Sequence, residues 1–248
     1  MSPATQWIGR WIVWTLATIG LALAVLAPDA IVHVWVGQRI GMARATAMPW
    51  IALLIDHAVM TLVALILIAL LSRGRMGEYG LQKPRGKSYL GASIGWGIFF
   101  GVLMTVADYL PSLLAHKAPE SYPLTPANIG GWLVFSFVYV GFTEEIPFRG
   151  LLQTFLMQRT TGRIRIGHYD MHAAGVVLAV LFALAHVSNF WVRPFWAALA
   201  QQVYAIALGI LYAYWREKSG SLTAAVIGHN LSDGIELSIV FFLEWIWR

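Results

Sequence analysis

The stretch GFTEEIPFRG, residues 141–150, places three charged side chains and a proline inside an otherwise apolar run. The residues before it read GWLVFSFVYV and those after it read LLQTFLMQ, so the whole segment is long enough to cross a bilayer. An ionisable side chain in such a span costs several kcal/mol if it faces lipid. The stretch therefore predicts a polar site that other spans enclose.

The composition of the chain is typical of a membrane protein. Hydrophobic residues make up 58% of its 248 residues, only 12% are charged, and the mean hydropathy is +0.67. This balance leaves too little polar surface to cover a soluble globule. Its twelve Trp and nine Tyr residues suit the boundary between hydrocarbon and headgroups. No internal repeat is visible, so we expect a single transmembrane domain over residues 1–248.

The net charge of +5 does not indicate a nucleic-acid partner, because the basic residues lie in short loops between apolar runs rather than along one face. We expect membrane lipids as partners and no nucleic acid. The chain has no cysteine, which excludes disulfides and thiolate sites. Any metal would need histidine and carboxylate ligands.

The fold class that follows is an all-α, polytopic membrane helix bundle with a buried polar site. A span needs about 20 apolar residues. Seven windows meet this need, at residues 8–27, 50–71, 89–114, 129–158, 172–190, 194–215 and 222–246. The first resembles a signal sequence, and we interpret it as a retained span. Residues 31–41 are too short to span and are expected to lie at an interface.

The distribution of Lys and Arg predicts the orientation, since cytoplasmic loops hold more of them. The amino terminus and the loops after spans two, four and six share one side of the membrane. That side holds Arg10, Arg73, Arg75, Lys83, Arg85, Lys87, Arg159, Arg163, Arg165, Arg216 and Lys218. We expect a cytoplasmic amino terminus and a bacterial inner-membrane location. The basic stretch 72–87 could also bind anionic headgroups.

The two glutamates of the opening stretch are expected to have different roles. Glu145 and Arg149 are four residues apart on one helix face, where they can form a bidentate ion pair. Glu144 points about 100° away from Glu145 and has no partner at helical spacing. It is therefore the carboxylate left free for chemistry. Pro147 removes a backbone hydrogen bond and is expected to bend the span near this pair.

Two other spans contribute ionisable side chains. His186 lies in span five, and His229 and Asp233 are four residues apart on one face of span seven. An isolated intramembrane histidine is more often a hydrogen-bonded interior residue than a catalyst. Two histidines on different spans, together with an unpaired glutamate, are the parts of a hydrolytic site.

At these positions the chain resembles the CPBP family of intramembrane proteases, which includes the type II CAAX prenyl endopeptidases and bacteriocin-processing and self-immunity relatives. The family patterns EExxxR, FxxxH and HxxxN/D appear in order as Glu144-Glu145-Ile-Pro-Phe-Arg149, Phe182-Ala-Leu-Ala-His186 and His229-Asn-Leu-Ser-Asp233. The motif-bearing core covers about residues 129–240. The first three spans match in length and apolarity only.

The resemblance implies an intramembrane endopeptidase that hydrolyses a peptide bond in membrane-anchored or membrane-proximal substrates. Glu144 would be the general base, and His186 would help it to hold the attacking water. His229 and Asp233 would lie beside the developing oxyanion. Glu145 and Arg149 would be the structural ion pair of the first motif.

Asp233 occupies a position where prenyl-protease relatives have Asn, and an ionised carboxylate cannot donate to an oxyanion. Asp233 could be protonated, could orient His229, or could bind a metal with His186, His229 and Glu144. The cofactor therefore stays open between none and a divalent metal such as zinc, which accepts nitrogen and oxygen ligands. The oligomeric state and the substrate are likewise open.

Two other functions fit the same residues. A proton-coupled transporter or relay would use the buried Glu, His and Asp side chains to carry protons. A non-catalytic scaffold or immunity protein would keep the helices and bind a partner. The outer ends of the spans hold further polar residues, which we interpret mainly as a hydrated rim: Asp56, His57, Asp108, His116 and Glu236.

Overall fold

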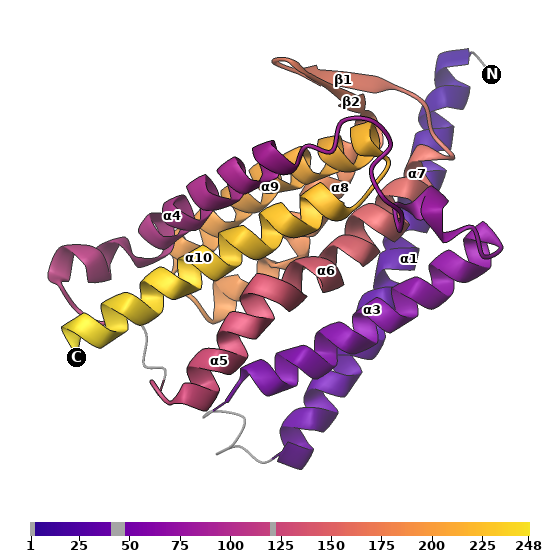
Figure 1. The fold of residues 1–248 in the computed structure, drawn as a ribbon. Coiled ribbons are helices and arrows are strands. Elements are labelled where there is room, and N and C mark those ends of the chain that lie inside the picture. The colour runs from indigo at the N-terminus through magenta and orange to yellow at the C-terminus, as the bar shows by residue number, and fades with distance from the viewer. Residues whose placement is uncertain (1–2, 41–47, 120–122) are drawn as a thin grey trace.

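The computed structural model describes residues 3–40, 48–119 and 123–248, and these residues form a helical membrane bundle (Figure 1). Within these ranges, seven helical segments are long and apolar enough to cross a membrane. The predicted fold class is confirmed. Five spans are formed by α1 (Pro3–Ile40), α3 (Trp50–Ser72), α4 (Leu90–Ala115), α9 (Phe195–Ser219) and α10 (Thr223–Trp247), of which α4 has a kink at Tyr109. Another consists of α8 (Ala173–Ala185) and the short 3-10 helix η4 (Val187–Trp191).

Six of the seven predicted windows agree with the observed spans to within a few residues, but the first was wrong at its end. Helix α1 continues to Ile40, so residues 31–40 are not a separate interfacial segment. Pro28 lies inside this helix and does not end it. Ile31 is 68% exposed, as expected of a helix side that faces lipid. In lipid a continued helix keeps backbone groups hydrogen-bonded, which favours it over an irregular segment.

Span four is central in the bundle and is the least regular one. It runs through α5 (Pro126–Val134), the π-helical η2 (Phe135–Tyr139), α6 (Val140–Glu145), the π-helical η3 (Ile146–Gln153) and α7 (Thr154–Met157). Residues 145–156 are all buried, because α1, α3, α8, α9 and α10 surround this span. Pro147 is the second residue of η3. The backbone disruption expected at Pro147 thus occurs as a wider helical turn, a form often found at functional sites.

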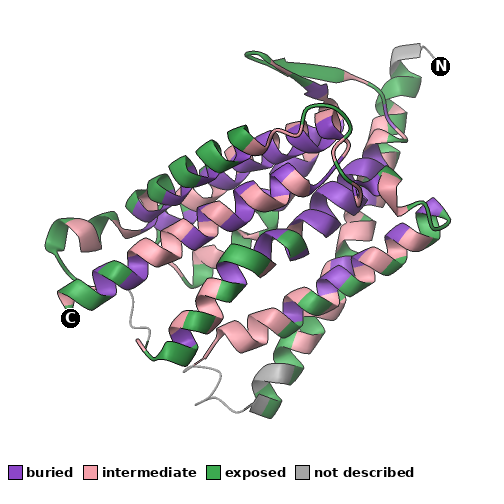
Figure 2. Cartoon of the chain, viewed as in Figure 1, coloured by how far each residue is buried: buried purple, intermediate pink, exposed green. Residues whose placement is uncertain are grey.

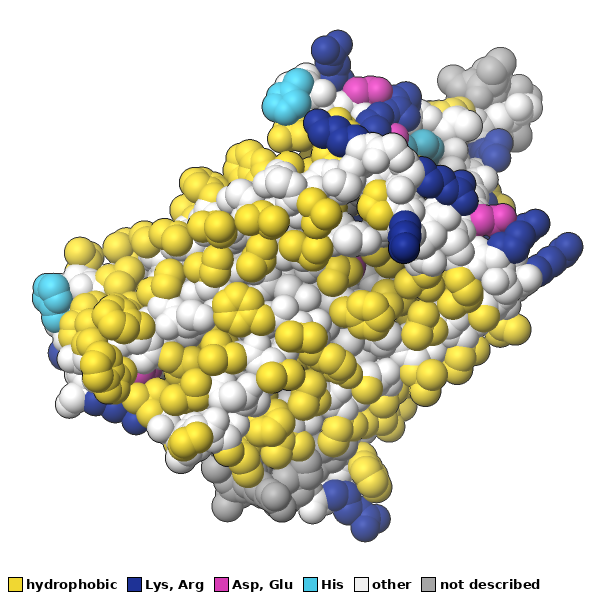
Figure 3. Space-filling model, viewed as in Figure 1, with side chains coloured by type: hydrophobic (Ala, Val, Ile, Leu, Met, Phe, Trp, Pro, Cys, Tyr) yellow, Lys and Arg dark blue, Asp and Glu magenta, His cyan; other side chains and the backbone are white. Residues whose placement is uncertain are grey.

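The remaining helices pack as pairs around span four. Helix α1 lies against α3, α4 against α10, and α8 against α9 (Figure 1). Buried residues concentrate on the sides of the helices that face one another, and exposed residues lie on the outward sides (Figure 2). The face of the bundle seen in Figure 3 is largely hydrophobic outside its charged end. This is the arrangement that a bilayer requires.

One end of the molecule carries a charged loop region. The 3-10 helix η1 (Met76–Tyr79) and the antiparallel hairpin of β1 (Arg163–Ile166) and β2 (Tyr169–His172) lie there. Most Lys and Arg side chains visible on this face gather at the same end (Figure 3). Arg163 of β1 pairs with Asp170 of β2 at 2.8 Å, and its contact with Glu217 at 3.1 Å joins the hairpin to α9. The sequence predicts only a basic loop here, and the hairpin is a feature of the structure.

Helices α4 and α10 approach closely at two glycines of α4. A Cβ atom on Gly97 would lie 2.8 Å from the Cβ of Leu231, and one on Gly101 would lie 2.7 Å from the Cβ of Ile235. Small residues four positions apart allow membrane helices to pack at short distance. Because α10 carries His229, this close approach determines where the second histidine lies.

Replacing Gly101 by Val should therefore destabilise the protein by about 1–3 kcal/mol, since the added methyl groups overfill the interface. Thermal unfolding in detergent measures the effect. Gly95→Val is the matched control, because Gly95 is on the same helix and a Cβ there meets nothing within 4 Å. Equal loss of stability in the two variants would show that helix propensity, not packing against α10, causes the effect.

Candidate active site

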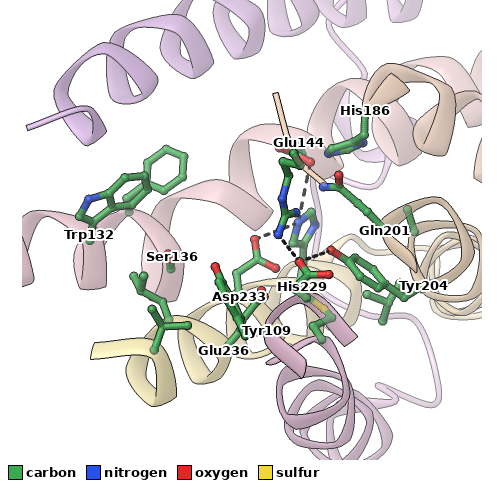
Figure 4. A pocket seen from close by; sticks show the side chains of 18 of the residues that line it. Tyr109, Trp132, Ser136, Glu144, His186, Gln201, Tyr204, His229, Asp233 and Glu236 are labelled. Carbon is green, nitrogen blue, oxygen red and sulfur yellow. Dashed lines mark hydrogen bonds and ion pairs between the residues drawn. The ribbon is translucent and has the colours of Figure 1, made fainter. Parts of the chain in front are cut away.

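A cavity of about 520 Å³ opens between span four and helices α4, α8, α9 and α10. Glu144 from α6, His186 from the end of α8, and His229 and Asp233 from α10 all line it (Figure 4). The structure therefore brings together the four side chains that the sequence singled out. Apolar side chains such as Trp132 and Phe135 share the wall with further polar ones, among them Asp108, Arg193 and Glu236.

Glu144 is held by two histidines. Its Oε1 atom is 3.2 Å from Nε2 of His57, and its Oε2 atom is 3.8 Å from Nε2 of His229. The side chain is 14% exposed, and it faces the cavity. The sequence predicts a glutamate without a partner at helical spacing, and within its own helix this is correct. Its close partner, His57, comes from α3 and had been assigned to the outer rim.

Glu145 is completely buried and accepts two hydrogen bonds on the same oxygen. Arg149 Nη1 donates to its Oε1 atom at 3.0 Å, and His229 Nδ1 donates to that atom at 2.9 Å. The predicted ion pair is present, but the bidentate geometry was wrong, since Oε2 has no partner in the described protein. The Arg149 guanidinium lies over the ring of Phe182, 4.1 Å from its centre. The pair therefore anchors the first motif to the other two.

The ring of His229 has a fixed orientation. Glu145 holds Nδ1, and the ring stacks on Tyr212 with centres 5.6 Å apart and planes 21° apart. Its Nε2 atom consequently points between Glu144 and Asp233, whose Oδ2 is 3.6 Å away. Three carboxylates thus surround the ring, and together they compensate the charge of an imidazolium.

The position of Asp233 bears on its three possible roles. Because Glu145 already holds Nδ1 of His229, the ring does not depend on Asp233 for its orientation. Asp233 instead accepts a hydrogen bond from the Ser232 hydroxyl at 3.3 Å on Oδ1, while Oδ2 faces His229 Nε2. The carboxylate of Asp233 therefore lies beside the cavity, where it can stabilise a positive charge on His229.

His186 is the polar residue of the second motif, Phe182-Ala-Leu-Ala-His186. Its Nδ1 atom donates to the carbonyl of Phe182 at 2.9 Å, and its ring meets the Phe182 ring edge to face at 5.0 Å. A neutral ring with the proton on Nδ1 has a lone pair on Nε2. His186 can therefore accept a proton or a hydrogen bond in the cavity beside Glu144 (Figure 4).

Two of the five residues expected in the hydrated rim, Asp56 and Asp108, are buried, and His57 and Glu236 are partly buried. Asp108 is 6% exposed and binds Arg193 at 2.6 Å and the hydroxyl of Tyr204 at 3.1 Å. Glu236 lines the same cavity, and Asp56 pairs with His33. Of the five residues assigned to the rim, His116 alone is exposed. The burial cost of ionisable groups inside apolar spans was the signal that could have identified the others.

In the part of the chain that the structure describes, no group of three His, Asp or Glu side chains is arranged to hold a metal ion. His186 uses Nδ1 for Phe182, and His229 uses Nδ1 for Glu145, so each histidine has one nitrogen left for the cavity. A histidine that binds a metal commonly bonds its other ring nitrogen in this way, so the cofactor stays open between none and a divalent metal.

Comparison with known families gives one result. Residues 126–235 match the family described as type II CAAX prenyl endopeptidase Rce1-like. This segment includes all three motifs and excludes α1, α3 and α4. No protein with curated annotation and no solved structure matches the chain significantly.

Proposed function

Because the chain belongs to the type II CAAX prenyl endopeptidase Rce1-like family through residues 126–235, we propose that it is an intramembrane endopeptidase. Its substrates are membrane-anchored or membrane-proximal peptides, and its nucleophile is a water activated by Glu144 and histidine. The observation that best supports the proposal is the distance of 3.8 Å between Glu144 Oε2 and His229 Nε2, both at the wall of the cavity.

The first chemical step places a water beside Glu144 Oε2 and His186. Glu144 takes one proton of that water while its oxygen bonds to the carbonyl carbon of the scissile peptide. The carbonyl electron pair moves to the oxygen and makes an oxyanion. An ionised carboxylate accepts the proton, and the lone pair of His186 Nε2 can hold the second hydrogen of the water.

The second step breaks the carbon–nitrogen bond. The oxyanion collapses to a carboxyl group, and the leaving nitrogen takes the proton that Glu144 had accepted, which returns Glu144 to its starting form. His229 donates to the oxyanion through Nε2 when it is an imidazolium, since its Nδ1 is bound to Glu145. Asp233 faces the same nitrogen and stabilises that charge.

The same proposal includes the orientation of the protein in a bacterial inner membrane. The hairpin and most Lys and Arg residues lie at one end, so we place that end and the amino terminus on the cytoplasmic side. The cavity accepts a peptide that is presented by the bilayer. Labelling of single cysteines introduced into the hairpin and into residues 116–118, in intact and in opened cells, tests this orientation.

The function is tested with purified protein in lipid nanodiscs and with membrane-anchored peptides that carry a quenched fluorophore. Cleavage and a new peptide end identified by mass spectrometry are the expected result. A scaffold would bind the peptides and leave them intact. A preparation that shows no cleavage of any anchored peptide contradicts the proposal.

His186→Gln should lower kcat about 10-fold to 100-fold in this assay, because the water loses its second contact and is positioned less well. The comparison is with His168→Gln on the exposed hairpin, which should cleave at the wild-type rate. If His186→Gln cleaves the peptide at the wild-type rate, His186 does not position the attacking water.

A proton relay is the second candidate, and the contacts give it one argument. His57, Glu144, His229 and Asp233 follow one another at 3.2, 3.8 and 3.6 Å, and the cavity continues to Glu236. Proteoliposomes that contain a pH-sensitive dye distinguish the two functions. Proton flux without peptide cleavage favours the relay, and cleavage without flux favours the peptidase.

A further inference from the structure

We propose that His57 of α3 is a positioning residue that orients the carboxylate of Glu144. His57 lies outside the three motifs and outside the matched segment 126–235. The inference rests on the proposed function, in which Glu144 is the general base. Its basis is the hydrogen-bond geometry around the His57 ring.

The two nitrogens of His57 have different partners. Nδ1 lies 2.9 Å from the carbonyl oxygen of Leu53, and Nε2 lies 3.2 Å from Oε1 of Glu144. A carbonyl can only accept, so Nδ1 carries a hydrogen. Because the proposed general base is an ionised carboxylate, the further proton lies on Nε2 of a His57 imidazolium, and Nε2 donates it to Oε1 of Glu144.

This bond decides which oxygen of Glu144 is available. Oε1 is engaged by His57, so Oε2 is the atom that faces His229 across 3.8 Å. Without His57 the carboxyl group can rotate about its terminal bond, whose torsional preference is broad. The oxygen that accepts the proton of water would then no longer be held in one position.

The position of His57 is itself fixed by α3 and span four. The ring meets Phe135 edge to face, with centres 5.2 Å apart and planes 86° apart. On one side of it the Tyr139 hydroxyl donates to the Leu54 carbonyl at 2.9 Å and joins the two helices. On the other side the single hydrogen of the Thr61 hydroxyl is shared between the His57 carbonyl at 2.7 Å and the Thr143 carbonyl of span four at 3.2 Å. These contacts hold α3 at the distance that the bond to Glu144 needs.

The surroundings of His57 favour its hydrogen bond to Glu144. The His57 side chain is 16% exposed, so little water competes for Nε2. Ionisable residues inside membrane helices are retained where they have a partner or a function, and here Glu144 is that partner.

The experiment measures kcat and KM of peptide cleavage for His57→Gln, His57→Asn and His57→Ala in nanodiscs. His57→Ala should lower kcat about 10-fold to 100-fold, the usual effect of losing a group that orients a functional side chain, and should change KM less than about 2-fold. Gln can still reach Oε1 with a donor and should recover part of kcat, whereas the shorter Asn should behave as Ala does. His116→Gln on an exposed helix end is the control and should match the wild type.

A second measurement does not need cleavage. Difference infrared spectra between the wild type and Glu144→Gln isolate the carboxyl bands of Glu144, and these bands should shift when His57 is replaced by Asn or Gln. Unshifted bands, or equal kcat for the wild type and a folded His57→Ala protein, overturn the proposal. Absence of peptide cleavage by the wild type defeats the proposed function instead, and the infrared shift then still tests the bond between His57 and Glu144.

Discussion

Replacing Glu144 by Gln should lower kcat for peptide cleavage by about 10²–10⁴-fold, the range that a general base contributes. The amide has almost the same shape as the carboxylate and can still contact His57 and His229, but it cannot accept a proton from water. We therefore expect a folded protein that binds peptide and does not cut it. The measurement is cleavage of a membrane-anchored peptide, together with binding of the same peptide by the inactive variant.

Glu78→Gln is the control for this result, because it makes the same chemical change at a side chain that is 45% exposed in the loop region. It should leave both kcat and the unfolding temperature unchanged. Cleavage by Glu144→Gln at more than about one tenth of the wild-type rate would show that another group activates the water. In that case Glu144 is not the general base, and the proposed role of His57 in orienting it is wrong as well.

Replacing Arg149 by Leu should destabilise the protein by about 3–5 kcal/mol, the usual result of removing one partner from a buried ion pair. Both Arg149 and Glu145 are 0% exposed, so the change leaves a carboxylate without its cation where water cannot solvate it. Leu also removes the contact with the Phe182 ring. Equilibrium unfolding in mixed micelles measures the free energy of unfolding.

Two comparisons show whether the charge is the cause. Arg75→Leu breaks an exposed ion pair with Glu78 and should change stability by less than about 1 kcal/mol. The double variant Glu145→Gln with Arg149→Leu should be more stable than Arg149→Leu alone, since it carries no unpaired carboxylate. If the double variant is the less stable of the two, Glu145 is not ionised and the ion-pair interpretation is wrong.

The spans and the local pairs were predictable because they depend on residues close together in the chain. Helical spacing placed Glu145 beside Arg149, and His229 beside Asp233, and both placements are confirmed. The cost of burying an ionisable group identified Glu144 and His186 as enclosed residues, and both line the cavity. Their catalytic roles stay predictions until the variants are measured.

The contacts between spans were not predictable in the same way. From the sequence we interpret Asp108 and His57 as part of a hydrated rim, although both lie in predicted spans, because spacing along one helix does not reveal the partner on another. The close packing of α10 on α4 at Gly97 and Gly101 is likewise a contact that no spacing within one helix predicts.

By itself, the sequence determined that this protein is a bundle of apolar helices with charged groups that must avoid lipid, because hydrophobicity and helical period are local properties. Only the tertiary structure decided that Glu145, not Asp233, holds the ring of His229, and that His57 reaches Glu144 from α3. Those bonds depend on the distances between helices. Close packing and the wide turns of span four determine these distances, and residue spacing within one helix does not predict them.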